Sequence, residues 1–275
     1  MKKIQNPKSK FQTNFNNKKF LRLKNILSKY SGVVVAFSGG VDSTLLLKVA
    51  LAVLKDRVVA VTVDSPLYPK GELREAKKIA RRLKVRHLII HSDELKNQNF
   101  VKNKKTRCYY CKIELFRNLQ KIAREYGYTV VEASNKTDLK DFRPGLLAAK
   151  KMGVDSPLIK AGLLKEEIRM LARKFGLPNW NKPSMACLAS RIPYGRRIKR
   201  EVLTRISKAE DYLKRFKITQ VRVRDHLPIA RLEVLPHEFR MILENKTQII
   251  RYLKKLGYRY ITLDLEGYKS GSMNL

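Results

Sequence analysis

The stretch that decides the fold is Phe37-Ser-Gly-Gly-Val-Asp-Ser-Thr44. It follows the apolar run 33–37, which has the length and β-branching of a buried strand. It precedes the leucine-rich run 45–52, which is typical of a mostly buried helix. A helix that begins after such a turn presents unpaired backbone N–H groups and a positive dipole end. The stretch therefore predicts an anion-binding loop between a strand and a helix.

The residue types of this loop fit a phosphate ligand. Two glycines let the backbone turn tightly around an oxyanion, and three hydroxyl side chains add donors. No lysine stands where a Walker loop requires one. The string Ser38-Gly-Gly-Val-Asp-Ser43 instead resembles the PP-loop of ATP pyrophosphatases. That resemblance implies cleavage of ATP between its α and β phosphates and transfer of AMP to a substrate oxygen. The alternative is a glycine turn with an ordinary helix N-cap, against which the six matching positions between a strand and a helix argue.

Length and composition indicate a two-domain protein with enough apolar residues for a sizeable core. The chain has 275 residues, of which 44% are hydrophobic. Its 60 lysines and arginines exceed its 24 acidic residues and give a net charge of +36. Such an excess favours polyanionic partners such as nucleotides or RNA, although a lysine-rich solvated surface explains it equally well.

The sequence shows no secretory signal and has an odd number of cysteines, so we expect a cytoplasmic protein without disulfides. The start Met1-Lys-Lys3 is not followed by an apolar segment, and the longest apolar stretch, 45–54, is too short to span a bilayer. Three cysteines are an odd number, which argues against a disulfide framework. We therefore expect no membrane association.

Strand and helix patterns alternate over residues 19–180, which predicts an α/β domain with a parallel, Rossmann-like sheet. Ligands in such sheets bind beyond the carboxyl ends of the strands, so Ser38, Asp64 and Ser134 are expected to share one crevice. The predicted strands are 33–37, 57–63, 85–90, 128–132 and 157–160, and the predicted helices are 20–30, 45–52, 71–84, 110–126, 144–152 and 165–175.

The alternation ends near residue 181, and a smaller α+β domain is predicted after it. Residues 1–18 form a basic tail that we expect to be loose, and residues 181–197 form a loop that carries Cys187. Residues 198–275 then form the C-terminal domain, for substrate binding or oligomerisation. Within it we predict helices at 198–216 and 237–256 and strands at 220–224, 230–235 and 258–263.

The three cysteines form a CxxC pair, Cys108 and Cys111, and a remote Cys187. Four interpretations stay open at this stage: a thioredoxin-type redox pair, a structural zinc site completed by His87 or His91, inert buried thiols, and a [4Fe–4S] cluster on three thiolates. The cluster uses all three cysteines and leaves one iron open for a terminal sulfide. A sulfur atom would then lie beside an ATP-activating loop.

At this point the sequence resembles a specific family, the LarE-type ATP-dependent sulfur transferases of nickel-pincer cofactor synthesis. The loop Ala186-Cys-Leu-Ala-Ser-Arg-Ile-Pro-Tyr-Gly195 is the most specific match, and the matches together run from about residue 20 to the end. The other matching segments are Ser38–Ser43, Arg107–Lys112, Asn135–Asp138, Arg143–Gly145, Ala161–Arg169, Gly176–Trp180, Val221–Arg224, Ala230–Val234 and Leu263–Gly271. Lys269 departs from the family, where arginine is expected.

The resemblance implies a substrate and a source of sulfur. The substrate is pyridinium-3,5-biscarboxylic acid mononucleotide, made from nicotinic acid adenine dinucleotide; ATP with Mg²⁺ adenylates a carboxylate, and sulfur then displaces AMP to leave a thiocarboxylate. Some members surrender the sulfur of the cysteine that matches Cys187. Others carry three cysteines and resemble cluster enzymes, and Cys108 and Cys111 place this chain in that second group. We also expect a sulfur donor and a homo-oligomer.

The candidate site residues follow from the loop, the resemblance and the charge of the substrate. The catalytic candidates are Cys187, Asp42 and Lys165, and the cluster ligands are Cys108, Cys111 and Cys187. The ATP-binding candidates are Ala36, Phe37, Ser38, Gly39, Gly40, Asp42, Ser43, Thr44 and Val63. The substrate-binding candidates are Asn135, Asp138, Arg143, Arg191, Arg222 and Arg224, since guanidinium forks match carboxylates and phosphates. Glu210 and Glu233 are further candidate polar partners.

Two other functions stay open. A tRNA thiolation enzyme of the same superfamily also combines a PP-loop with three cysteines, and the charge of +36 would suit its substrate. A non-catalytic nucleotide-binding module is the alternative from another class.

Overall fold

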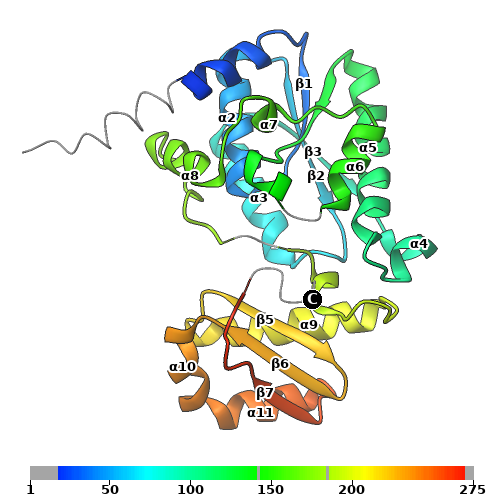
Figure 1. The fold of residues 1–275 in the computed structure, drawn as a ribbon, viewed down its shortest axis with the longest axis vertical. Coiled ribbons are helices and arrows are strands. Elements are labelled where there is room, and N and C mark those ends of the chain that lie inside the picture. The colour runs from blue at the N-terminus through cyan, green and yellow to red at the C-terminus, as the bar shows by residue number, and fades with distance from the viewer. Residues whose placement is uncertain (1–17, 141–142, 184–185, 270–275) are drawn as a thin grey trace, which may run out of the picture. The chain divides into compact units, whose positions relative to one another are not determined.

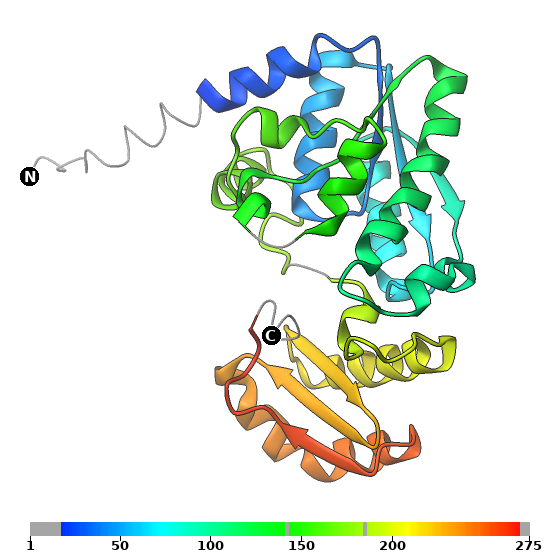
Figure 2. The same cartoon turned by 45° about the vertical axis from the view of Figure 1, so that its right-hand side comes forward.

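The computed structural model describes residues 18–140, 143–183 and 186–269, which form two compact units. The first unit comprises the described parts of 1–64, 70–92 and 108–184, and the second those of 65–69, 93–107 and 185–275. Figures 1 and 2 show both units. The predicted basic tail lies outside the described residues except for residue 18, which begins a helix that ends at residue 27. No helix in the described ranges has the length and apolar character needed to cross a membrane.

The first unit contains a parallel sheet, as the alternating pattern predicts. Its strands are β1 (Val33–Ala36), β2 (Val58–Asp64), β3 (Arg86–His91) and β4 (Thr129–Val131). Their order is β3-β2-β1-β4, with β1 in the centre between β2 and β4. Strand β1, whose three valines are buried, carries the anion-binding loop at its carboxyl end, where parallel sheets place their ligands.

Helices cover both faces of this sheet (Figure 1). Val33 and Val35 of β1 point to a core shared with α2 (Val41–Leu54), α3 (Lys70–Arg82) and α8 (Lys165–Lys174). Val34 points to the other face and packs with α5 (Arg107–Tyr126) and α6 (Pro144–Lys151). Successive side chains of a strand alternate between faces, so a run of valines fills two cores at once.

The predicted fifth strand, 157–160, is wrong, because this segment is the helix α7 (Pro157–Lys160). Proline at the first helical position has a φ already suited to a helix, and it lacks the N–H that an inner strand must donate. The sheet gains instead one isolated parallel bridge between Val131 and Asp155, before the proline.

The second unit contains a mixed three-stranded sheet, shown in Figure 2. Strand β5 (Val221–His226) pairs antiparallel with β6 (Ile229–Val234), and β6 pairs parallel with β7 (Tyr260–Leu263). Its core is formed with α9 (Arg200–Leu213), α10 (Phe239–Glu244) and α11 (Lys246–Lys255). The prediction of a C-terminal α+β region is therefore confirmed. The unit also includes the short helix α4 (Gln98–Val101) and a 3-10 turn, η3 (Leu188–Arg191).

Two long helices predicted in this unit are shorter than expected. The segment 237–256 breaks into α10 and α11 at Asn245, whose side chain donates to the Met241 carbonyl (2.8 Å) and so ends the first helix. The segment 198–216 forms α9 and then a 3-10 turn, Lys214–Phe216. Segments 65–69 and 93–107, which the sequence boundaries assign to the PP-loop domain, belong to the second unit.

Candidate functional site

The loop between β1 and α2 has the backbone geometry that its glycines predict. Gly39 has φ +70°, and a Cβ added there would lie 3.1 Å from the Ala76 Cα of α3, so a larger residue is strained and crowded. Gly40 is the N-cap of α2 and has no side chain to bond the first N–H groups of the helix. These groups therefore stay available for an anion.

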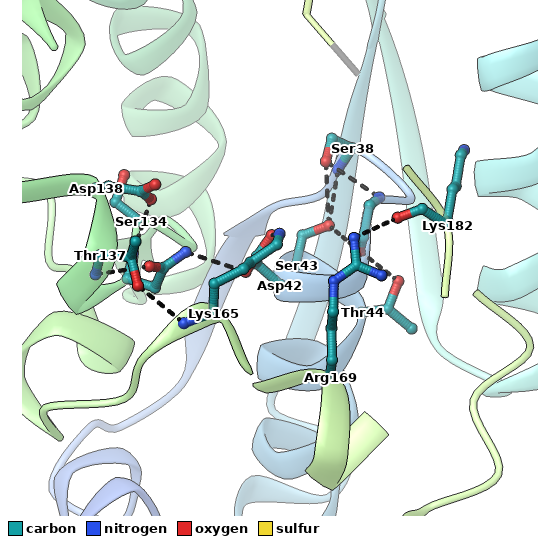
Figure 3. A network of polar contacts seen from close by, with 12 residues as sticks. Ser38, Asp42, Ser43, Thr44, Ser134, Thr137, Asp138, Lys165, Arg169 and Lys182 are labelled. Carbon is teal, nitrogen blue, oxygen red and sulfur yellow. Dashed lines mark hydrogen bonds and ion pairs between the residues drawn. The ribbon is translucent and has the colours of Figure 1, made fainter. Parts of the chain in front are cut away.

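The three hydroxyls of the loop have different surroundings (Figure 3). Ser43 and Thr44 are buried, and both hydroxyls donate to the Gly40 carbonyl, at 3.1 and 2.8 Å. Ser38 is exposed, and its hydroxyl oxygen accepts from the Gly40 N–H at 3.3 Å. Ser38 thus faces solvent beside the loop, whereas the other two hydroxyls hold the turn together.

A charged pair lies at the start of α2. The Lys165 ammonium, at the start of α8, forms an ion pair with the Asp42 carboxylate, and the two side chains are 26% and 20% exposed. Asn135 Nδ2 donates to Asp42 Oδ1 at 3.2 Å, and the Lys165 N–H donates to Thr137 Oγ1 at 3.0 Å. The structure therefore brings together the predicted residues Asp42, Lys165 and Asn135. All of them remain partly accessible except Asn135, which is buried.

Asn135 and Asp138 belong to one turn after β4. The Asn135 N–H donates to Asp138 Oδ2 at 3.0 Å, and Asp138 Oδ1 forms an ion pair with Arg143 at 2.9 Å. The Arg143 side chain is 47% exposed. Asn135 and Asp138 therefore shape the turn, while Arg143 is the member of the group that reaches solvent.

A buried asparagine that the sequence does not mark as a site residue closes the back of the loop. Asn179 is buried, and its side-chain amide donates to the Gly39 carbonyl and to Thr44 Oγ1, both at 2.9 Å. Arg169 of α8 donates to the carbonyls of Trp180 and Lys182, at 3.1 and 2.8 Å, and so fixes the segment that carries Asn179. The resemblance included 176–180, but only the contact across the fold gives Asn179 a role.

Thr62 and His87 support the end of β1. Thr62 Oγ1 donates to the Phe37 carbonyl at 2.7 Å and therefore accepts from His87 Nε2 at 2.8 Å. Burial, helped by the charge of Lys77, holds the pKa of His87 below its usual range and keeps the ring neutral. The hydrogen bond to Thr62 gives His87 a structural role that does not require a zinc ion.

The three apolar ATP-binding candidates lie in or beside the central strands. The Phe37 side chain packs in the core, so only its backbone can face a ligand. Ala36 and Val63 are half-buried members of β1 and β2.

The cysteines are all thiols, and they are divided between the two units. Cys108 is exposed and Cys111 half-buried, both in α5 of the first unit, and Cys187 is half-buried in the second unit. Within the described residues, no three His, Cys, Asp or Glu side chains form a group that could hold a metal ion. The three-thiolate cluster accordingly stays a prediction.

The loop after Cys187 is fixed by a buried arginine. Arg191 is fully buried and binds both carboxylate oxygens of Glu210, at 2.8 and 2.9 Å. Its remaining nitrogen donates to the carbonyls of Ala186 and Cys187, at 2.7 and 3.0 Å. The side chain thus sets the backbone of Cys187, with Glu210 as its buried counter-charge.

Arg224 of β5, two residues after Arg222, repeats this arrangement. Arg224 binds both oxygens of Glu233, at 2.8 and 2.7 Å, and donates to the Ser190 carbonyl at 2.9 Å. Arg222 is buried on the same strand, with its guanidinium over the Tyr268 ring at 5.2 Å. Burial, together with the nearby charge of Arg191, lowers the pKa of Arg222. Arg191 and Arg224 therefore both bind backbone carbonyls within residues 186–190, and Arg222 lies close enough to Arg191 to feel its charge.

Comparison with known proteins agrees with this geometry. The PP-loop domain family matches residues 7–142. The chain is 38% identical over 244 residues to the pyridinium-3,5-bisthiocarboxylic acid mononucleotide synthase of Lactiplantibacillus plantarum, covering 88% of each chain. It is 40% identical to an uncharacterized Synechocystis protein, covering 93% of this chain and 97% of that one. It is 30% identical to an uncharacterized protein of Methanocaldococcus jannaschii, covering 92% and 98%. The chain therefore belongs to the LarE-like family of PP-loop proteins, with the bisthiocarboxylic acid mononucleotide synthase as a relative.

Proposed function

We propose that the protein is an ATP-dependent sulfur transferase that converts a carboxylate of pyridinium-3,5-biscarboxylic acid mononucleotide to a thiocarboxylate. The observation that carries this proposal is the Asp42–Lys165 pair at the start of α2, beside the glycine loop. It places one carboxylate and one ammonium where a nucleotide phosphate would meet the helix N-terminus. The named relative supports the choice of substrate.

The first step activates a poor electrophile. A substrate carboxylate oxygen attacks the α-phosphorus of ATP, the bond to the bridging oxygen breaks, and pyrophosphate leaves with the electron pair. The loop N–H groups and Lys165 stabilise the charge that develops on the phosphates. Asp42 is a partly exposed carboxylate, which suits Mg²⁺, and bound Mg²⁺ would neutralise charge on the departing pyrophosphate. The product of this step is an acyl adenylate.

The second step transfers sulfur. A sulfur nucleophile attacks the acyl carbon, the carbon–oxygen bond breaks, and AMP leaves. If Cys187 is the nucleophile, a thioester forms; removal of its Cα proton and cleavage of its Cβ–S bond then leave dehydroalanine and a thiocarboxylate. The alternative source is a [4Fe–4S] cluster on Cys108, Cys111 and Cys187, which would supply sulfide from its open iron. Cys187 contributes to both routes, so Cys108→Ala distinguishes them: the cluster route loses activity and the sacrificial route keeps it.

The buried arginines have two roles under this proposal. Arg191 and Arg224 already bind glutamates through both arms, so their contribution is to hold the Cys187 loop. Arg222 and the exposed Arg143 are the proposed contacts for the carboxylates and phosphate of the substrate.

Exchange of labelled pyrophosphate into ATP tests the first step without any sulfur source. We expect exchange that depends on the dicarboxylate mononucleotide and that falls by about 10²-fold or more in Lys165→Met, the scale of losing one stabilising donor. Lys174→Met, an exposed lysine at the end of the same helix, is the matched control. Exchange without the mononucleotide, or equal exchange in both variants, contradicts the proposal.

The charge of +36 favours one second candidate, a tRNA thiolation enzyme. That function requires a tRNA complex whose affinity falls steeply with salt, and tRNA-dependent pyrophosphate exchange. Filter binding at two salt concentrations, with the exchange assay alongside, decides between the two acceptors.

A further inference from the structure

A buried asparagine in the second unit joins the segment before Cys108 to the loop after Cys187. Asn103 is fully buried, and its side-chain amide donates to the carbonyls of Pro193 and Arg196, at 2.7 and 2.9 Å. A longer contact of 3.4 Å reaches the Ile192 carbonyl. One side chain therefore satisfies two carbonyls of a loop about 90 residues further along the chain.

The acceptor end of the same side chain holds Arg107. Arg107 is buried, its Nη1 donates to Asn103 Oδ1 at 2.7 Å, and its guanidinium lies 4.5 Å from the centre of the Tyr194 ring. Tyr194 belongs to the loop that Asn103 binds. Arg107 is thus fixed both by the asparagine and by the loop.

Backbone hydrogen bonds reinforce the junction. The Gly195 N–H donates to the Asn103 carbonyl at 3.1 Å, and the Ile198 N–H donates to the Val101 carbonyl at 2.9 Å. Asn103 has φ +53°, a left-handed conformation that asparagine tolerates better than most residues. The segment therefore turns sharply where its side chain enters the loop.

These contacts lie next to Cys108 and Cys187 along the chain. Cys108 follows Arg107 in the chain, so its Cα lies about 3.8 Å from that of Arg107. Arg191 donates to the Cys187 carbonyl at 3.0 Å. Arg191 is bonded to Ile192, the first residue of the 192–196 loop that Asn103 contacts. Contacts within one unit thus connect the backbone of Cys187 to the residue bonded to Cys108.

We propose that Asn103 is a positioning residue that latches Arg107 to the 192–196 loop and so limits the separation of the Cys108 and Cys187 thiols. This inference rests on the proposed function, in which those thiols act together. Asn103 touches neither substrate nor sulfur; it acts through Arg107 and the loop.

Two substitutions separate the amide donors from the backbone conformation. Asn103→Asp keeps the left-handed tolerance and the acceptor for Arg107, but it removes the N–H groups that the loop carbonyls need. Asn103→Gly removes the side chain without strain at positive φ. Asn99→Ala, an exposed asparagine in α4 of the same segment, is the matched control.

The test is chemical cross-linking of the apoprotein. Cys111→Ser leaves Cys108 and Cys187 as the thiols of the chain, and a short bismaleimide forms one S–C bond with each thiol while each thiol proton moves to the maleimide carbon. Intact mass gives the rate of the intramolecular product. We expect both Asn103 variants to lower this rate about tenfold, the factor that corresponds to roughly 1.4 kcal/mol, and Asn99→Ala to leave it unchanged. Thermal unfolding, measured alongside, should occur at a lower temperature in Asn103→Asp because the loop carbonyls lose their donor, whereas ATP binding should change little.

The outcomes are distinguishable from failure of the proposed function. Cross-linking that is fast in the parent and equally fast in both Asn103 variants overturns the latch and leaves convergence of the thiols intact. An absence of cross-linking in the parent overturns both the latch and the three-thiolate set. Neither result affects adenylation, which pyrophosphate exchange measures separately.

Discussion

The two units use charged side chains in opposite ways. In the first unit, Lys165 and Asp42 are 26% and 20% exposed beside the glycine loop. In the second unit, Arg191 and Glu210 are 0% and 1% exposed and bind each other through two hydrogen bonds. A partly exposed pair can exchange its partner for a ligand at small cost, whereas a buried pair cannot lose one member cheaply. The first arrangement is suited to binding, and the second to holding a loop in place.

The largest effect should follow from breaking a buried pair. Glu210→Gln leaves the Arg191 charge buried without its carboxylate, which costs about 3–5 kcal/mol of unfolding free energy. Trp180 is the single tryptophan and lies in the first unit, so its fluorescence follows that unit while circular dichroism follows both. We expect the urea concentration at the midpoint of unfolding to fall more when it is followed by circular dichroism than when it is followed by fluorescence.

The exposed pair Arg240–Glu244 of α10 supplies the control for that experiment. Glu244→Gln should leave both unfolding curves unchanged. A Glu210→Gln protein as stable as the parent would remove the distinction between the two units.

The next effect concerns the partly exposed pair. Asp42→Asn should lower pyrophosphate exchange by about 10²-fold, the scale of a lost electrostatic contact to the transition state, and leave the unfolding free energy nearly unchanged. Exchange rates at saturating ATP and mononucleotide, with urea curves on the same protein, measure both quantities. A large loss of stability with retained exchange would mean that Asp42 is a structural residue like Glu210.

A smaller effect is expected at Thr62 of β2, which supports the residue before the glycine loop. Thr62→Val removes the hydroxyl that donates to the Phe37 carbonyl, and an unsatisfied buried carbonyl costs about 1–3 kcal/mol. Thr62→Ser keeps the hydroxyl and should restore most of the loss. Because Thr62 belongs to the first unit, Trp180 fluorescence should report this change in urea unfolding. Equal stability of the valine and serine variants would contradict it.

The smallest effect is a dependence on pH. Burial lowers the pKa of His87 in the folded state below its ordinary value of 6.5, so the unfolded chain binds more protons near that pH. Its contribution is present above pH 6.5 and is lost as pH falls through the lowered folded pKa. His87→Gln keeps a donor for Thr62 but does not titrate, so its unfolding free energy should fall less steeply as pH decreases below 7. An unchanged slope of stability against pH would assign the decline to other groups.

The architecture could be predicted because the residues that determine it are close together in the sequence. The strand, glycine turn and helix around Gly39 are contiguous in the sequence, and so is the alternation that indicates a parallel sheet. The errors occurred where a short apolar run has no distinctive period, as in 157–160, or where one side chain ends a helix, as at Asn245.

The supporting residues of the site could not be predicted in the same way. Asn179 and Gly39 are 140 residues apart, and Asn103 and Arg196 are 93 residues apart. Nothing near Asn103 in a polar run of lysines and asparagines marks it as buried. The prediction that Arg191 and Arg224 clamp the substrate did not anticipate their pairing with Glu210 and Glu233, which each buried guanidinium needs as a counter-charge.

Asn179 has a consequence for how the loop can respond to its ligand. Its amide spans the turn, from the Gly39 carbonyl on one side to Thr44 Oγ1 on the other, and so fixes the aperture of the loop. A nucleotide that widens this aperture must displace Asn179, which lies five residues before the first unit ends at residue 184. Because Arg169 holds the segment after Asn179, such a ligand would also disturb the hydrogen bonds from Arg169 to the Trp180 and Lys182 carbonyls.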